Sequence, residues 1–387
     1  MNNIFYKVWG FFRQTAIRIY VAVGRLILKL TGSRRPETLF CLRANAEKIG
    51  TDVKIISEDD YSTTIAKVDE NGNIKDEDFV IVTSTDFHFC SDNARNKMTV
   101  EYFVKHVKEV KPDLVILTGD VILGKFQQIE AIQFAQMMEE LGIYWATVFG
   151  NHETREEKGF YKYLLLKSLS DYDHCLCKFG PEELFGYGNF IINILGKGGK
   201  LQKSLFLLDS GRDILDRDRE KYGIPDDMKG YDFFKNEQID FYKNEVDKLN
   251  TKYGKAESFL YFHIPLVEFS YAFKAEENGR YTPTGECEIL HGEQWESVGC
   301  SMHNSGMFDA ILEKGGKGVF CGHDHVNDWC GIYKGVHLVY NLPAGYAYHH
   351  GTNFGKPESE WVVGVTVTTL HNDGSFDIQP RYNRIFL

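Results

Sequence analysis

The sequence predicts an α/β protein whose first half alternates strands with helices. Three apolar runs typical of buried strands are separated by two stretches of helical periodicity, in the order Phe79–Thr83, Asn96–Val110, Asp113–Leu117, Gln127–Leu141 and Ile143–Val148. This alternation indicates βαβ units and a parallel sheet. Further apolar runs at Phe190–Leu195 and Ser204–Leu208 indicate a second sheet. With 387 residues, the chain can form one large α/β domain with additions, or two domains.

The composition fits a protein with a sizeable core in a reducing compartment. The chain is 43% hydrophobic and 14% aromatic. Its eight cysteines do not form a disulfide framework in a chain of this length, so we interpret them as reduced and predict a cytoplasmic location. The net charge of -11 disfavours a protein that binds long nucleic acids, because such proteins neutralise phosphates with cations.

The first 36 residues differ in charge from the rest of the chain. They hold seven basic residues and no acidic one, whereas the remainder has 37 basic and 55 acidic residues. On a helix over residues 4–30, Lys7, Arg18, Arg25 and Lys29 gather on one side, and no charge-free run is long enough to span a bilayer. This pattern predicts an amphipathic helix on an anionic membrane surface, at the inner face of a membrane. A helix packed on its own domain and an unusual signal sequence are the alternatives.

These observations divide the chain into three parts. Residues 1–36 form the basic N-terminal helix, and residues 37–78 form a short β preface with strand-like runs at Val53–Ser57 and Thr63–Val68. Residues 79–387 form the main domain, which carries all the candidate site residues. The irregular segment 270–305 within it is expected to be a lid or a surface insertion.

Polar side chains follow each of the three early strands. Asp86 and His88 come after the first strand, Asp120 after the second, and Asn151 with His152 after the third. Ligands of open α/β sheets bind beyond the carboxyl ends of the strands. Each cluster alone is explained by a cap or a turn. Three clusters at successive strand ends instead predict one shared site.

Two later strands add three histidines. Ser258–Phe262 leads into His263, and Gly318–Cys321 leads into His323 and His325. Alternation along an extended chain puts His323 and His325 on one side and the intervening Asp324 on the other. Imidazole is the commonest metal ligand near neutral pH, although an isolated H-x-H pair is more often an ordinary surface or core feature.

The assembled donors suit a pair of divalent transition metals. They are two carboxylates, one amide oxygen and four imidazoles: Asp86, Asp120, Asn151, His88, His263, His323 and His325. Magnesium and calcium prefer all-oxygen shells. Seven donors are too many for one tetrahedral zinc ion and fit two ions about 3.5–4 Å apart that share a carboxylate. Such a pair lowers the pKa of a bridging water, and the hydroxide attacks phosphorus in line.

Three residues in loops are candidates for substrate binding. Arg212, in the charged and turn-rich stretch 209–229, is either a solvated loop charge or a contact to a substrate phosphate. His349 and His350, in the loop 341–355, belong either to a rim of the site or to an ordinary surface loop.

Five short blocks of the sequence resemble the calcineurin-like metallophosphoesterase superfamily, in that family's order. The blocks are Asp86-x-His88, Gly119-Asp120, Gly150-Asn151-His152-Glu153, His263 and Gly322-His323-x-His325. The sequence around His323 is similar to that of the purple acid phosphatase-like branch, which includes fungal dosage-dependent cell-cycle regulator phosphatases. The resemblance covers about residues 79–341. It implies a two-sheet β-sandwich flanked by helices, an αββα arrangement, which agrees with the strand–helix alternation.

The resemblance also implies a role for each donor. One metal would bind Asp86, His88 and His325, the other would bind Asn151, His263 and His323, and Asp120 would bridge them. His152 would lie near the leaving-group oxygen as an electrostatic stabiliser or proton donor. Glu153, its neighbour, would orient His152.

One position departs from the purple acid phosphatases. Three residues after the bridging aspartate, where that family has a tyrosine that binds ferric iron, this chain has Leu123. The resemblance therefore implies a pair of manganese, ferrous iron or zinc ions rather than a purple ferric centre.

The sequence thus predicts a dinuclear-metal hydrolase of phosphate esters, with phosphomonoesters favoured. The first alternative is a phosphodiesterase or nuclease on the same metals, and the acidic body with no aromatic-basic stripe disfavours long nucleic acids as substrates. The second alternative is a non-catalytic, metal-stabilised interaction module. The substrate, the metals and the oligomeric state are open at this point.

Overall fold

The computed structural model describes most of the chain beyond the N-terminal segment. The described residues are 48–89, 95–124, 127–153, 160–345 and 362–384, together with Phe12, Thr15 and Ile19. Phe12, Thr15 and Ile19 are helical and exposed, but the predicted basic helix over residues 4–30 otherwise lies outside the described residues. Among the described residues, no helix is long and apolar enough to cross a membrane.

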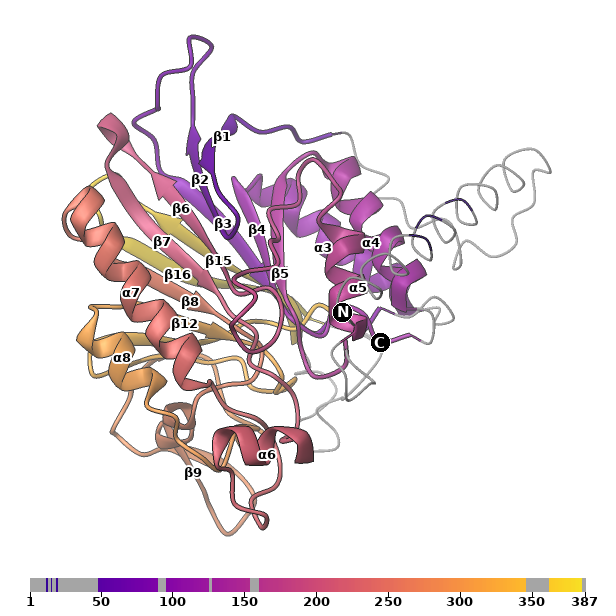
Figure 1. Cartoon of the computed structure of the whole chain (residues 1–387), viewed down its shortest axis with the longest axis vertical. Coiled ribbons are helices and arrows are strands. Elements are labelled where there is room, and N and C mark those ends of the chain that lie inside the picture. Colours follow the sequence, from indigo (N-terminus) through magenta and orange to yellow (C-terminus); the bar gives the residue numbers. More distant parts are fainter. Residues whose placement is uncertain are drawn as a thin grey trace.

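Two sheets packed face to face form the centre of the molecule (Figure 1). The smaller sheet has the strand order β16-β15-β3-β4-β5. Its strands are β3 (Phe79–Ser84), β4 (Leu114–Thr118), β5 (Tyr144–Val148), β15 (Val362–Leu370) and β16 (Phe376–Arg384). β3, β4 and β5 are parallel, as the alternation of strands and helices predicted.

The larger sheet has nine strands in the order β1-β2-β6-β7-β8-β12-β14-β13-β11. Its strands are β1 (Val53–Glu58), β2 (Ser62–Lys67), β6 (Phe190–Leu195), β7 (Leu201–Leu207), β8 (Ser258–Tyr261), β11 (Glu288–His291), β12 (Gly318–Cys321), β13 (Cys330–Tyr333) and β14 (Val336–Tyr340). β8 pairs in parallel with both β7 and β12. The predicted preface supplies the edge strand β1 and its neighbour β2.

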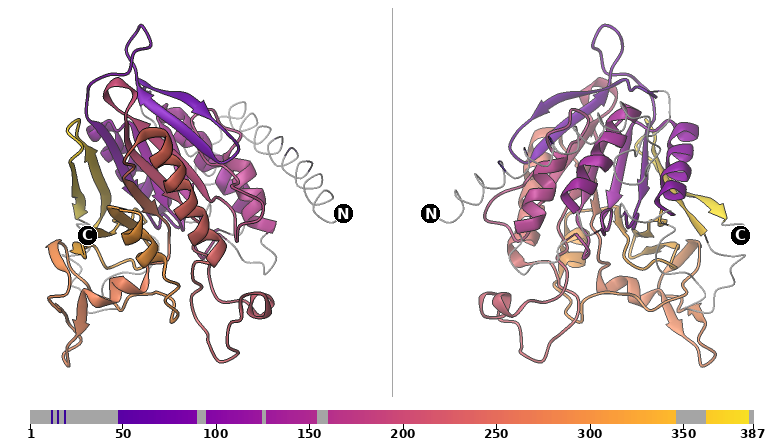
Figure 2. Two further views of the ribbon diagram at one scale, coloured as in Figure 1. Left: turned by 60° about the vertical axis from the view of Figure 1, so that its left-hand side comes forward. Right: turned by 90° about the vertical axis from the view of Figure 1, so that its right-hand side faces the viewer.

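Helices cover the outer face of each sheet, so the layers run helix, sheet, sheet, helix (Figures 1 and 2). α3 (Arg95–Val110), α4 (Gln127–Leu141) and α5 (Phe160–Leu169) lie on the smaller sheet, and α7 (Asn236–Tyr253) with α8 (Met307–Glu313) lies on the larger. The short helix α6 (Asp216–Tyr222) projects beyond the sheets. This arrangement confirms the predicted α/β fold, a two-sheet sandwich flanked by helices.

Side chains of the central strands are buried on both faces. In β7, Leu205 and Leu207 join the core between the sheets, whereas Phe206 and the following Leu208 join a second core under α7 and α8. Because consecutive side chains of a strand point to opposite faces, a strand covered on both sides is apolar throughout. This explains why the sequence shows continuous apolar runs here rather than alternation.

The segments that the sequence left irregular contain several elements. α6 lies within 209–229 and is made almost entirely of charged residues, so it has no apolar periodicity to reveal it. The expected insertion 270–305 contains β9 (Phe273–Ala275) and β10 (Tyr281–Pro283), which pair with each other, and also the edge strand β11. Part of that segment therefore belongs to the larger sheet.

A buried ion pair connects helix α5 to the loop that follows strand β7. Lys162 of α5 places its Nζ 2.6 Å from Oδ1 of Asp209, the residue just beyond Leu208, and the two side chains are 7% and 0% exposed. The Asp209 carboxylate also accepts hydrogen bonds from the backbone N–H groups of Tyr187 and Gly211, each at 3.0 Å. Three separate segments are therefore fixed to one carboxylate.

Replacing Lys162 with methionine should destabilise the fold strongly. The substitution keeps the aliphatic stem but leaves the Asp209 carboxylate buried without its cation, which costs about 3–5 kcal/mol. Urea unfolding monitored by circular dichroism measures the change. Lys178→Met is the matched control, because Lys178 pairs at 3.0 Å with Glu58, whose side chain is 58% exposed, and should lose no more than about 1 kcal/mol. Equal losses in the two variants would contradict the assignment.

Candidate metal centre

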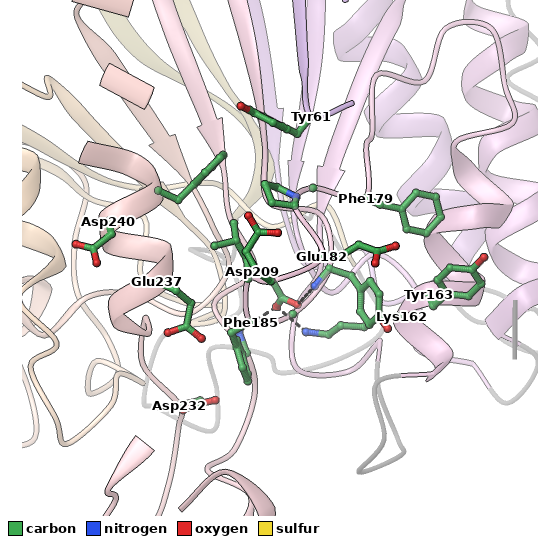
Figure 3. Close-up of a pocket in the computed structure, with 18 of the residues that line it drawn as sticks. Tyr61, Lys162, Tyr163, Phe179, Glu182, Phe185, Asp209, Asp232, Glu237 and Asp240 are labelled. Carbon is green, nitrogen blue, oxygen red and sulfur yellow. Dashed lines mark hydrogen bonds and ion pairs between the residues drawn. The ribbon is translucent and has the colours of Figure 1, made fainter. Parts of the chain in front are cut away.

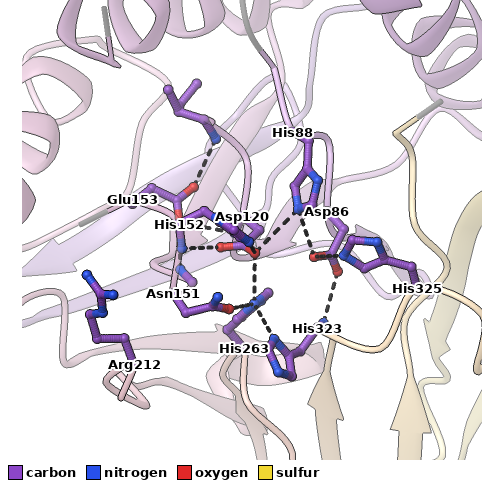
Figure 4. Close-up of polar contacts among 12 residues, drawn as sticks. Asp86, His88, Asp120, Asn151, His152, Glu153, Arg212, His263, His323 and His325 are labelled. Carbon is purple, nitrogen blue, oxygen red and sulfur yellow. Dashed lines mark hydrogen bonds and ion pairs between the residues drawn. The ribbon is translucent and has the colours of Figure 1, made fainter. Parts of the chain in front are cut away.

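The seven predicted donors come together at one edge of the sandwich, where parallel strands of both sheets end (Figure 4). Asp86 and His88 follow β3, Asp120 follows β4, and Asn151 follows β5. His263 follows β8, and His323 and His325 follow β12. The smaller sheet therefore supplies both carboxylates, and the larger sheet supplies three of the four imidazoles.

The first group of donors consists of Asp86, His88 and His325. Their ligand atoms lie within 4.8 Å of one another. Nε2 of His325 is 3.1 Å from Oδ1 of Asp86, and Nε2 of His88 is 3.5 Å from the same oxygen. Asp86 and His88 are 2% exposed, so these groups face one another away from bulk solvent.

The second group consists of Asp120, His263 and His323, again within 4.8 Å of one another. Nε2 of His263 is 3.3 Å from Oδ2 of Asp120 and 3.0 Å from the amide oxygen of Asn151. Nδ1 of His323 is 3.3 Å from Nε2 of His263. Two imidazole nitrogens facing each other at this distance, with an amide oxygen beside them, are arranged as ligands of a common cation.

Asp120 connects the two groups. Its Oδ2 is 3.3 Å from Nε2 of His88 and equally far from Nε2 of His263. A third group within 4.8 Å contains His88, Asp120 and His152, whose Nε2 is 3.8 Å from the same oxygen. His152 is 43% exposed at its side chain and therefore lies at the open side of the centre.

Glycines in three of the sequence blocks let the backbone pass directly under the ligands. A Cβ on Gly150 would lie 2.1 Å from Oδ1 of Asp120, and one on Gly322 would lie 1.9 Å from Oγ1 of Thr85. Gly119 has a φ of 92°, and a Cβ there would lie 2.7 Å from Nδ1 of His263. These contacts leave no room for a side chain, so glycine is required at each position.

Four of the donors have backbone conformations that are unfavourable for residues other than glycine. Asp86, His88, Asp120 and His323 have φ values of 51°, 48°, 49° and 77°. A left-handed conformation turns the chain sharply after a strand. The turn directs the side chain toward the other donors instead of along the strand. Strain of this kind, about 1–3 kcal/mol per residue, persists where the surrounding structure enforces it and is typical of functional sites.

A layer of hydrogen bonds orients the ligands. Oγ1 of Thr85 and the backbone N–H of His323 donate to Oδ2 of Asp86, at 2.7 and 2.9 Å. Nδ1 of His263 is 2.8 Å from the carbonyl oxygen of Thr118. That contact makes Nδ1 the protonated nitrogen and leaves Nε2 free to bind a cation, as in known metal sites.

Glu153, the predicted neighbour of His152, bonds to the backbone of both loops at the centre. It is 2% exposed, and its carboxylate accepts hydrogen bonds from the backbone N–H groups of Gly150, Ile122 and Asp120, at 2.7, 2.9 and 3.1 Å. These bonds fix the loops after β4 and β5 to each other. Any effect of Glu153 on His152 therefore acts through the loop backbone.

Asp324 points away from the donors, as alternation along the chain predicted. Its carboxylate accepts hydrogen bonds from the backbone N–H of Gly299 and from the hydroxyl of Tyr340. Burial raises the pKa of Asp324 to about 7. These contacts anchor the loop between His323 and His325 on the side opposite the centre.

The remaining candidates are less central. Arg212 is drawn apart from the donors in Figure 4 and forms an ion pair of 3.0 Å with Asp213. His349 and His350 lie outside the described residues. Leu123 is 8% exposed and offers no phenolate oxygen to a metal. The ring of Tyr231 meets that of His323 edge-on with 4.4 Å between centroids. Tyr231 was not predicted from the sequence, because it lies in a loop far from every block.

Comparison with known proteins identifies the family. The family model described as Calcineurin-like phosphoesterase matches residues 79–327. The chain belongs to the calcineurin-like phosphoesterase family. This confirms the resemblance seen in the sequence, and the family together with the three donor groups supports a centre for two divalent metal ions.

Two relatives and one solved structure show the range of similarity. The probable inactive purple acid phosphatase 29 of Arabidopsis thaliana is 30% identical over 305 residues, which cover 73% of this chain and 70% of that protein. Phosphatase DCR2 of Saccharomyces cerevisiae is 31% identical over 242 residues, 59% of this chain and 39% of that protein. A dimetal phosphatase from Danio rerio covers 80% of this chain and 98% of its own, with a TM-score of 0.47 and 13% identity.

Metal binding at this centre should release protons at neutral pH. Burial disfavours the charge on His88, but hydrogen bonds and attraction to Asp120 and Asp86 outweigh it and raise the pKa of His88 to about 9. Burial also disfavours the charge on His263, but attraction and hydrogen bonding to Asp120 outweigh it and raise the pKa of His263 to about 10. Both imidazoles are therefore protonated at pH 7 without metal, and a metal binds only the neutral form.

Calorimetric titration of metal-depleted protein with zinc or manganese measures this release. The observed heat should vary with the ionisation enthalpy of the buffer, and the slope gives the number of protons released per ion. The matched His88→Ala variant should release fewer protons. A heat that does not depend on the buffer would contradict the protonated state of these histidines.

Proposed function

We propose that this chain hydrolyses phosphate esters with two divalent metal ions, and that phosphomonoesters are its preferred substrates. The observation that carries the proposal is the position of Asp120, whose Oδ2 lies 3.3 Å from imidazole nitrogens of His88 and His263 on the two sides. A carboxylate shared between two groups of donors is the arrangement that a two-metal hydrolase requires.

Each group of donors would hold one ion. Asp86, His88 and His325 would bind the first, Asn151, His263 and His323 would bind the second, and Asp120 would bind both. Nitrogen and oxygen donors in these proportions suit manganese, ferrous iron or zinc. When bound, the two ions supply Lewis acidity, which makes a nucleophile from water at neutral pH and neutralises charge on the phosphate.

His152 would assist the departure of the leaving group. Its backbone N–H donates to Oδ1 of Asp120 at 2.8 Å, which fixes the residue beside the centre while the imidazole stays partly exposed. Burial lowers the pKa of His152. The neutral imidazole can donate a hydrogen bond to the leaving-group oxygen, and the imidazolium form can donate the proton that the departing alkoxide needs.

Arg212 would bind the phosphate from the side of Asn151. It lies on that side of the centre in Figure 4, and a guanidinium can hold two phosphate oxygens at once. His349 and His350 stay candidates for substrate contact on the sequence alone. Attachment of residues 4–30 to an anionic membrane surface and a cytoplasmic location also stay predictions from the sequence.

The non-catalytic alternative has one observation in its favour, which is the word inactive in the name of the Arabidopsis thaliana relative. The residues of this chain support catalysis instead. All seven donors converge, His152 stands at the open side, and four strained donors hold positions that a structural metal site does not need.

Removing the bridging carboxylate should abolish hydrolysis. Asp120→Asn or His323→Ala should lower kcat for p-nitrophenyl phosphate by at least about a thousandfold, because each tenfold loss corresponds to roughly 1.4 kcal/mol and a two-metal site supplies several times that. Steady-state assays with added manganese or zinc measure the change, and circular dichroism checks the fold. The exposed Asp226→Asn is the matched control and should keep its activity. Unchanged turnover in either site variant would refute the centre.

Comparing substrates with different leaving groups tests whether His152 acts on the leaving-group oxygen. His152→Ala should reduce kcat for an alkyl phosphate by about 10²–10⁴-fold, the usual contribution of a proton donor. The loss for p-nitrophenyl phosphate should be much smaller, because p-nitrophenolate leaves without a proton. The ratio of the two kcat values is the readout. Equal losses on both substrates would show that His152 does not act on the leaving group.

A further inference from the structure

A large groove opens beside the metal centre, between α5 and α7 (Figure 3). It has a volume of about 1260 Å³, which exceeds the roughly 300–1,000 Å³ typical of small-molecule pockets. α7 contributes residues three or four positions apart, from Glu237 through Asp240 and Asn244 to Lys248, so one whole face of the helix lines the groove. A space of this size and length fits an extended polypeptide better than a single small molecule.

Aromatic rings form much of the groove wall. Tyr163 packs against Phe179 at 5.2 Å between centroids, and Tyr61 packs edge-on against Phe241 at 5.6 Å. Phe185 and Tyr222 meet at 6.2 Å at the other end. Aromatic faces attract lysine and arginine side chains through their negative π-surfaces, and they also cover the aliphatic stems of those side chains.

The groove carries an excess of negative charge. Ten of its lining residues are aspartate or glutamate, and five are lysine or arginine. All five cations already form ion pairs with carboxylates: Lys162, Lys167, Arg212, Lys221 and Lys248. Within the described parts of the chain, Asp60, Glu183 and Asp240 are exposed carboxylates that form no ion pair. The groove therefore presents unneutralised acidic groups on an aromatic surface.

The groove reaches segments of the chain that adjoin the metal centre. Arg212 lines the groove and is drawn in the same view as the donors in Figure 4. Asp232 also lines the groove, and the residue before it, Tyr231, packs against the metal-ligand candidate His323. A phosphate held at the centre would thus leave the rest of its polypeptide at the mouth of the groove.

We propose that the groove binds the basic flanking residues of a phosphorylated polypeptide, which makes phosphoproteins with lysine and arginine near the phosphorylated residue the substrates of this enzyme. This inference rests on the proposed phosphatase function and names its substrate class. The metal centre takes the phosphate, and the acidic aromatic groove takes the cationic side chains. The same charge repels nucleic acids and other polyanions.

The test compares two phosphoserine peptides that differ only in their flanks, one with lysine and arginine and one with glutamate. The native chain should turn over the basic peptide with a kcat/KM at least about tenfold higher, mainly through a lower KM, because charge complementarity acts on binding. In the triple variant Asp60→Lys, Glu183→Lys and Asp240→Lys this preference should disappear. Hydrolysis of p-nitrophenyl phosphate should not change, because these residues lie away from the centre.

The matched control is the triple variant Glu70→Lys, Glu277→Lys and Glu286→Lys. It makes the same change in net charge at exposed residues outside the groove, and it should keep the preference for the basic peptide. If the native chain turns over both peptides equally, or if the groove variant keeps the preference, the proposal is overturned. Loss of the preference in both triple variants would also overturn it, since the effect would then come from net charge alone.

Binding of an unphosphorylated lysine- and arginine-rich peptide separates this proposal from the proposed function. Fluorescence anisotropy with a labelled peptide should show binding to the native chain and to the control variant, and at least about tenfold weaker binding to the groove variant. Failure of all ester hydrolysis with this binding pattern intact would refute the phosphatase function and retain the groove. Equal binding by all three proteins would refute the groove, whatever the enzyme activity.

Discussion

The buried carboxylate of Asp120 is the group on which the site depends, because it faces a histidine from each sheet. His88 comes from the smaller sheet and His263 from the larger, and both lie 3.3 Å from the same oxygen. Bringing one carboxylate between two imidazoles requires the strand ends to meet closely. Gly119 and Gly150 permit this approach, since a Cβ at either would collide with His263 or Asp120 itself.

The outer contacts of Asp120 explain why the surrounding loops are built as they are. Glu153 accepts hydrogen bonds from the backbones of Asp120, Ile122 and Gly150, and the N–H of His152 donates to Asp120. A single buried acid thus fixes both loops that carry Asp120 and His152. Burial raises the pKa of Glu153 to about 7, and its three backbone donors compensate the acid for the loss of water.

The groove beside the metal centre is the surface that we propose for substrate recognition. In this chain the candidate metal ligands gather at the strand ends, and membership of the family does not by itself fix the substrate. Selectivity then has to come from surfaces next to the centre. In our proposal that surface is the groove between α5 and α7, where Lys162 and Asp209 of the lining form a buried ion pair.

The sequence by itself determined the αββα class and the order of the blocks, because buried parallel strands are apolar throughout and each one ends in polar residues. It also pointed to the seven candidate donors, since their residue types and their positions after strands are local properties. The roles of Tyr231 and Glu153 were decided only by the tertiary structure, because their contacts join segments that are distant along the chain or pass through backbone groups. The charged helix α6 and the groove were likewise invisible, because an all-polar helix has no periodicity and a cavity exists only between packed elements.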